Sequence, residues 1–120
     1  MPRVVHFEIN VEDVDRAIKF YSEVLGWKFE KWDGPMEYWM ITTGSGEEPG
    51  INGGLTLKGT FDNLHTVMVS SVDEYISKVL ANGGELAGPK MAIPGMGYLA
   101  YVKDPEGNLF GIMDRDESAA

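Results

Sequence analysis

Apolar and polar residues alternate over residues 4–11, which is the period of two that a β-strand shows. One side of this segment consists of Val5, Phe7, Ile9 and Val11. The other side consists of His6, Glu8 and Asn10. The alternation predicts a strand with one packed face and a second face that carries polar groups.

The spacing of the apolar residues then changes to that of a helix. The helical stripe consists of Val14, Ile18, Tyr21 and Leu25. Asp13 suits the N-cap of this helix, and Gly26 can end it in a left-handed conformation. Strands are predicted over residues 27–33, 38–43 and 51–58. Gly53 and Gly54 in the last of these predict a bulge or the close approach of another backbone segment.

The same order of elements begins again at residue 64. A strand over 64–69 precedes a helical stripe that ends at Gly83 and Gly84. A weaker strand over 85–93 is broken by Gly88 and Pro89, and strands over 97–103 and 109–114 follow. The second half therefore predicts the same set of elements as the first half.

A shift of 58 residues lays the two halves on each other. This shift pairs the following residues: Val11 with Val69, Val14 with Val72, Ile18 with Ile76, and Gly26 with Gly84. We therefore predict an α+β fold of tandem βαβββ modules, whose mixed sheet is cupped with the helices outside. Module one covers residues 3–59, module two covers 62–114, and 115–120 form a tail. A chain of 120 residues suits a single domain, 1–120.

Composition narrows the function classes. The chain has no cysteine, which excludes disulfides, thiolate catalysis and Cys-ligated zinc. Its net charge of −9, without a basic cluster, argues against nucleic acid as a partner. No apolar run has the length of a membrane span or of a signal peptide, so we expect no membrane association and a cytoplasmic location.

Several segments resemble a known superfamily. They are the strand residues 5–9, the helical segment 13–21 with Leu25-Gly26-Trp27, the loop 93–98, and the turn Lys103-Asp104-Pro105-Glu106-Gly107-Asn108. With these segments the sequence resembles the vicinal oxygen chelate superfamily, which includes glyoxalase I, extradiol dioxygenases and bleomycin-resistance proteins. The match covers nearly the whole chain and looks closest to glyoxalase-related proteins. The resemblance implies a cup for a small molecule and a homodimer.

The resemblance also implies where a metal ion would be held. The family takes a His or Glu from the first strand of each half and a Glu or equivalent from each last strand. His6 matches the first position, the second falls on Leu64, and the others fall near Gly53 and Gly111. Because three of the four positions lack a ligand, we expect no metal cofactor.

Two residues leave a metal site open as an alternative. Glu8 shares a strand face with His6 and could add one oxygen ligand. His65 aligns with Phe7 and shares the parity of Val67, which places it on the helix-facing side. A one-residue bulge in that strand would turn His65 into the cup.

His6 and Glu8 are the candidate catalytic residues. We expect the carboxylate of Glu8 to favour the protonated form of His6. The alternative is that His6 is a hydrogen-bonded residue that lines a wet cavity. The candidate ligand-binding residues are Trp39, Met96, Tyr98, Tyr101 and Phe110. Aromatic side chains inside the cup would give an apolar, stacking pocket, whereas ordinary sheet packing is the alternative for most of them.

Three functions follow from this reading. The first is a metal-free pocket that binds a small organic molecule, either in a sequestering protein or in an enzyme. The second is a metal-dependent lyase, isomerase or dioxygenase that uses His6 with a divalent ion. The third is a non-catalytic interaction module, which a large apolar patch outside the cup would favour.

Overall fold

The structure is a computed structural model that describes residues 2–34, 36–58 and 62–120. Contacts divide the chain into two compact units, His6–Leu64 and Met1–Val5 with His65–Ala120. Residues 3–5 of predicted module one fall in the unit with His65–Ala120, and its predicted end at residue 59 lies outside the described residues. The bounds of the two modules stay a prediction. That the chain forms a single domain stays a prediction.

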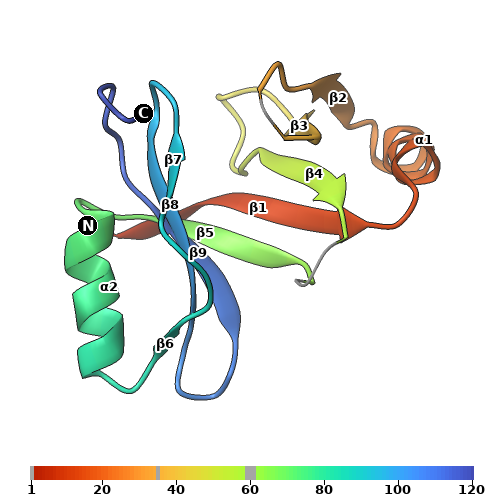
Figure 1. Ribbon diagram of the computed structural model, residues 1–120. Helices are drawn as coiled ribbons and strands as arrows, with labels where there is room; N and C mark the ends of the chain where they lie inside the picture. Colours follow the sequence, from red (N-terminus) through yellow and green to blue (C-terminus); the bar gives the residue numbers. More distant parts are fainter. Residues whose placement is uncertain (1, 35, 59–61) are drawn as a thin grey trace. The chain divides into compact units, whose positions relative to one another are not determined.

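Module one contains one helix and four strands (Figure 1). They are β1 (Arg3–Val11), α1 (Val14–Leu25), β2 (Lys28–Lys31), β3 (Tyr38–Thr42) and β4 (Gly53–Leu57). The strands lie in the order β2-β3-β4-β1, so that the last strand of the module lies beside the first. β1 and β4 are parallel, whereas the β2–β3 and β3–β4 pairs are antiparallel.

The predicted signals at the two ends of α1 are confirmed. The Asp13 side chain accepts a hydrogen bond of 3.0 Å from the backbone N–H of Arg16. At the other end Gly26 has a φ of +72°, and its N–H donates to the carbonyl of Ser22. The left-handed conformation at this position costs glycine no Cβ clash, so the helix ends there.

The core of module one lies between α1 and one face of its sheet. Ile9, Ile41 and Leu55 are buried there, each from a different strand. Partly buried side chains from α1 and its flanks pack against them: Val14, Ala17, Tyr21 and Trp27. Because side chains alternate along a strand, His6 and Glu8 fall on the opposite side of the sheet. We call the side of each sheet opposite the helix of its own module the helix-free face.

Module two repeats this arrangement with one added strand. Its elements are β5 (Leu64–Met68), α2 (Val72–Ala81), β6 (Glu85–Leu86), β7 (Met91–Ile93), β8 (Gly97–Lys103) and β9 (Leu109–Met113). β5 and β9 are parallel, whereas β8 pairs in antiparallel fashion with β9, β6 and β7. The predicted strand over 85–93 is thus two short strands on β8, because Gly88 and Pro89 interrupt it.

The core of module two lies beneath α2. Val72 of the helix is fully buried against the strand residues Ala100, Val102 and Ile112. Each module therefore has a helix on one face of a mixed sheet. The predicted α+β fold of tandem βαβββ modules is confirmed.

The predicted tail at 115–120 is packed against the turn between β7 and β8. The N–H of Asp116 donates to the carbonyl of Met96, and the N–H of Gly95 donates to that of Ala119. Ala119 is only 5% exposed. These contacts attach the end of the chain to the turn that carries Met96.

Candidate functional site

The helix-free face of module one joins His6 to a tyrosine from a distant part of the chain. The Tyr38 Oη atom lies 2.6 Å from the Nε2 atom of His6. The two rings are nearly parallel, with an angle of 16° between their planes. Both side chains are half-buried. This close polar contact is the centre of the candidate site.

Gly54 allows Tyr38 to reach His6. Tyr38 belongs to β3 and His6 to β1, and β4 lies between these strands. A Cβ atom at Gly54 would overlap the hydroxyl and ring of Tyr38. The close backbone approach that the sequence predicts occurs at Gly53, where a Cβ atom would lie 2.6 Å from the carbonyl oxygen of Phe7. At Gly54 a tyrosine side chain crosses the strand.

Further side chains on this face surround the pair. The Trp32 ring lies edge-on to the Tyr38 ring, with 6.2 Å between the ring centroids. Met40 pairs with Gly54 across β3 and β4 and is 46% exposed. Such a mixture of apolar groups with a few placed polar groups is typical of small-molecule sites.

Burial sets the charge state of His6. It lowers the pKa of His6, because the protonated ring loses hydration. The pKa of His6 is thus lowered by burial, whereas a neighbouring carboxylate alone was expected to raise it. Glu8, which is 8% exposed, accepts a hydrogen bond of 3.3 Å from the Asn10 amide.

The hydroxyl of Tyr38 stays protonated near neutral pH. Burial raises the pKa of Tyr38, and the negative charge of Glu8 raises it further. A phenol hydroxyl donates to an imidazole nitrogen that carries no proton and accepts from one that does. The tautomer of His6 therefore sets the direction of this hydrogen bond.

The register identifies the residues at the expected metal positions in the last strands. Gly54 pairs with Glu8, whereas Gly53 pairs with Phe7. The residue of β4 on the His6 face is thus Gly54 and not Gly53, which corrects the alignment by one position. In module two Gly111 pairs with Thr66. Both positions are glycines, so neither supplies a metal-ligating side chain.

The donor set does not fit the metal site that the family resemblance implies. Within residues 2–34, 36–58 and 62–120, no group of three or more His, Asp or Glu side chains is placed to hold a metal ion. The Nε2 atom of His6 is engaged by Tyr38, and position 54 has no side chain. A divalent site normally needs about three protein ligands.

His65 lies where its parity predicts. Its ring stacks on Phe110, with 6.0 Å between the centroids and 12° between the planes. The pairing from Thr66 to Met68 with β9 is continuous and contains no bulge. His65 therefore remains on the side of β5 that also carries Val67, which packs against the core beneath α2.

Three of the five predicted ligand-binding residues lie on helix-facing sides. Trp39 packs against the core of module one, and Tyr98 and Phe110 pack against the core of module two. These three side chains therefore do not lie on the helix-free faces, where a ligand was expected to bind. Sheet packing, the alternative for them, accounts for their placement.

The other two predicted ligand-binding residues have different surroundings. Tyr101 pairs with Gly111 and alternates with the core residues Ala100 and Val102, so it falls on the helix-free face of module two. Met96 is 55% exposed in the turn between β7 and β8. Ligand binding by these residues stays a prediction.

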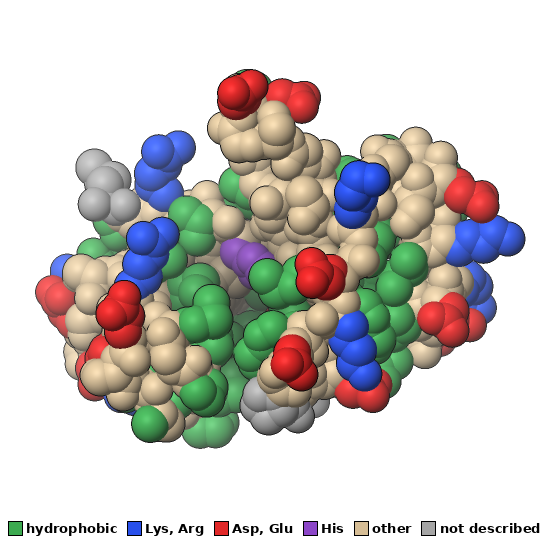
Figure 2. Space-filling model, turned by 90° about the horizontal axis from the view of Figure 1, so that it is seen from above, with side chains coloured by type: hydrophobic (Ala, Val, Ile, Leu, Met, Phe, Trp, Pro, Cys, Tyr) green, Lys and Arg blue, Asp and Glu red, His purple; other side chains and the backbone are tan. Residues whose placement is uncertain are grey.

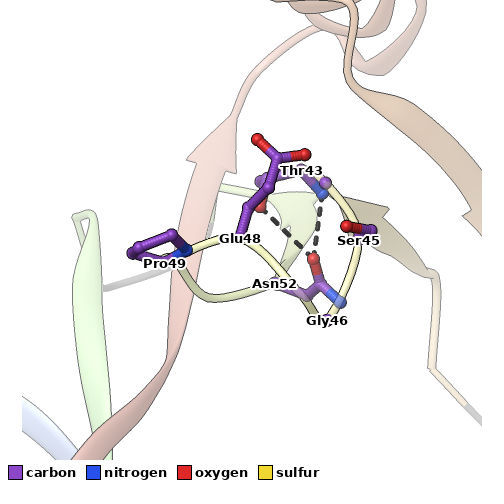
Figure 3. A pocket seen from close by; sticks show the side chains of 8 residues that line it. Thr43, Ser45, Gly46, Glu48, Pro49 and Asn52 are labelled. Carbon is purple, nitrogen blue, oxygen red and sulfur yellow. Dashed lines mark hydrogen bonds between the residues drawn. The ribbon is translucent and has the colours of Figure 1, made fainter.

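A separate small hollow lies in the loop between β3 and β4 (Figure 3). It measures about 110 Å³ and is lined by residues from Thr43 to Asn52. The backbone N–H of Thr43 donates to the side chain of Asn52 at 2.9 Å, which closes the loop. The hollow is smaller than the several hundred Å³ of common ligand pockets, and neither His6 nor Tyr38 lines it.

The charged side chains form no single basic patch on the face that Figure 2 shows. Lys and Arg side chains are scattered there among Asp and Glu side chains. Of the residues that the structure describes, neither helix is long and apolar enough to cross a bilayer.

Comparisons with known proteins connect this geometry with a superfamily. Residues 3–44 match the family described as bleomycin resistance protein-like N-terminal. A probable lactoylglutathione lyase of Vibrio parahaemolyticus is 28% identical over 98% of this chain and 94% of its own length. The chain belongs to the vicinal oxygen chelate superfamily. The resemblance seen in the sequence is thus confirmed.

Two further comparisons, one with a sequence and one with a solved structure, also cover most of this chain. A lactoylglutathione lyase of Arabidopsis thaliana is 32% identical over 94% of this chain, which spans only 44% of that protein. A solved glyoxalase/bleomycin resistance protein/dioxygenase superfamily member from Vibrio splendidus has a TM-score of 0.65 and 20% identity. That alignment covers 95% of this chain and 99% of the solved one, and it shows the same fold.

The sequence identified His6 but missed its partner. Tyr38 was one of many aromatic residues in predicted strands, and its spacing did not separate it from the others. The available signal was Gly54, a glycine inside a strand on the same face as His6. Such a glycine indicates that a bulky group crosses the strand.

Proposed function

We propose that this glyoxalase-like protein binds a small organic molecule on the helix-free face of module one and needs no metal ion for binding. The contact between His6 and Tyr38 carries this proposal. It presents a neutral imidazole and a phenol side by side, which can exchange hydrogen bonds with a polar group of a ligand.

The surroundings of this pair support an organic ligand. Trp32 and Met40 supply apolar surface on the same face, next to the polar pair. Apolar contacts give a small ligand most of its affinity, and a few hydrogen bonds fix its orientation. The lactoylglutathione lyases among the relatives bear names of enzymes for small organic molecules, in line with this ligand class.

A ligand screen in the presence of a chelator tests the proposal. Small carbonyl, hydroxyl and aromatic compounds are added to ¹⁵N-labelled protein with EDTA, and chemical-shift changes are recorded. We expect compounds that shift the Trp32 indole signal and that bind about tenfold or more weakly to the Tyr38→Phe variant. The His65→Ala variant, changed at the other histidine, should bind them as the unchanged protein does. Binding that appears only after a divalent metal is added would contradict the proposal.

A metal-dependent lyase is the second candidate. The 28% identity to a probable lactoylglutathione lyase over nearly the full length of both chains favours it. In that case His6 and Glu8 would hold a divalent ion, which would polarise an oxygen of the substrate. Metal-stimulated turnover of a dicarbonyl–thiol adduct that is lost in the His6→Ala variant would support this candidate. No turnover with a panel of divalent ions would count against it.

A further inference from the structure

Tyr38 and a side chain at position 54 exclude each other. The Tyr38 hydroxyl occupies the space that a Cβ atom at Gly54 would enter. Position 54 pairs with Glu8, so a carboxylate there would stand beside Glu8 and on the face of His6. The glycine thus removes one metal donor, and the tyrosine fills the vacated space.

The same tyrosine also engages the remaining donor. A neutral imidazole coordinates a metal through a ring nitrogen that carries no proton. In His6 the Nε2 atom is hydrogen-bonded to the Tyr38 hydroxyl over 2.6 Å. A metal ion can reach Nε2 only after the tyrosine has moved away. Tyr38 therefore fills the space of the metal ligand that is missing at position 54 and also engages the Nε2 atom of His6.

We propose that Tyr38 is a specificity-determining residue, which excludes divalent metal ions from His6 by covering Gly54 and occupying the Nε2 atom. The inference rests on the proposed metal-free ligand site and names the side chain that makes it metal-free. Tyr38 thereby links two departures from the superfamily pattern, the glycine in β4 and the engaged histidine in β1.

A cobalt titration observed by NMR tests this role. The chain contains two histidines, so the ring signals of His6 and His65 can be assigned and followed separately. We expect Co²⁺ to broaden the His6 signals of the Tyr38→Phe variant at about tenfold lower concentration than those of the unchanged protein. His65 reports non-specific binding within each sample. Tyr75→Phe, which removes a tyrosine hydroxyl from α2, is the matched control and should behave as the unchanged protein does.

A second pair of variants tests the space over Gly54. Tyr38→Ala opens this space, and Tyr38→Ala combined with Gly54→Glu fills it with a carboxylate. We expect the double variant to bind Co²⁺ more tightly than Tyr38→Ala alone. Binding in each variant is compared by calorimetry, after two-dimensional spectra have shown that the protein is folded.

The inference is overturned if the same Co²⁺ concentration broadens the His6 signals of the unchanged protein and of Tyr38→Phe. It is also overturned if Co²⁺ broadens the His6 signals of neither protein. If neither binds, the metal-free ligand site itself still stands. If no compound binds in the screen with EDTA, the proposed function is contradicted, whereas the cobalt result still holds. The two experiments thus fail separately.

Discussion

The hydroxyl of Tyr38 lies 2.6 Å from Nε2 of His6, although 32 positions separate these residues in the chain. The contact crosses β4 above Gly54, which pairs with Glu8 of β1. Three strands of one module therefore build the centre of the candidate site. The following changes test how this arrangement depends on its parts.

Substitution of Gly54 by alanine should separate Tyr38 from His6. The added Cβ atom would overlap the Tyr38 hydroxyl, so the tyrosine side chain must rotate away. We expect the His6 ring signals to shift and the free energy of unfolding to fall by about 1 kcal/mol, as for one lost hydrogen bond. NMR and urea unfolding measure the two effects.

Gly111→Ala is the matched control for this change. Gly111 pairs with Thr66 as Gly54 pairs with Glu8, and a Cβ atom there would lie 2.9 Å from the Thr66 hydroxyl oxygen. This substitution should leave the His6 signals in place. If both alanine variants shift the His6 signals equally, Gly54 has no special role beneath Tyr38.

The stability of the protein should depend on the protonation of His6. Burial holds the pKa of His6 below its ordinary value of 6.5, so the unfolded state takes up the proton more readily than the folded state. The contribution of neutral His6 is fully present above pH 6.5 and is lost as the pH falls from there through the folded-state pKa. Below that pKa the loss is complete.

Urea unfolding at a series of pH values measures this loss. The His6→Gln variant should lose less stability than the unchanged protein between about pH 7 and pH 5, because glutamine does not titrate. Identical pH profiles for His6→Gln and the unchanged protein would show that His6 is not buried as described.

Truncation of Leu55 should show where the core of module one lies. Leu55 is fully buried between α1 and the sheet, so Leu55→Ala should lower the free energy of unfolding by about 2–5 kcal/mol. Val24→Ala is the control, since Val24 is 61% exposed and its truncation should cost less than about 0.5 kcal/mol. Similar losses for the two variants would contradict this core.

Local patterns predicted the elements of the fold. The alternation in β1, the caps at Asp13 and Gly26, and the break at Gly88 and Pro89 act through neighbouring residues, so the chain order alone reveals them. The repeat also predicted the side of β5 on which His65 lies, because side chains alternate strictly along a strand without a bulge.

Register was the point at which sequence reasoning failed. The shift of 58 residues holds from β1 to β5, but Gly54 and not Gly53 corresponds to Gly111. The loops before β4 and β9 differ in length, and a difference of one residue moves a side chain to the other face. For the same reason the sequence left open which side Trp39, Tyr98 and Phe110 face, and the structure packs all three against the cores.

The sequence by itself determined the two βαβββ modules and the face of β1 that carries His6, because strand and helix periods depend on residues close together in the chain. Only the tertiary structure decided that Tyr38 is the partner of His6 and that Gly54 lies beneath it. These relations depend on the order and register of three paired strands. Hydrogen bonds between distant segments set that register, and no local pattern records them.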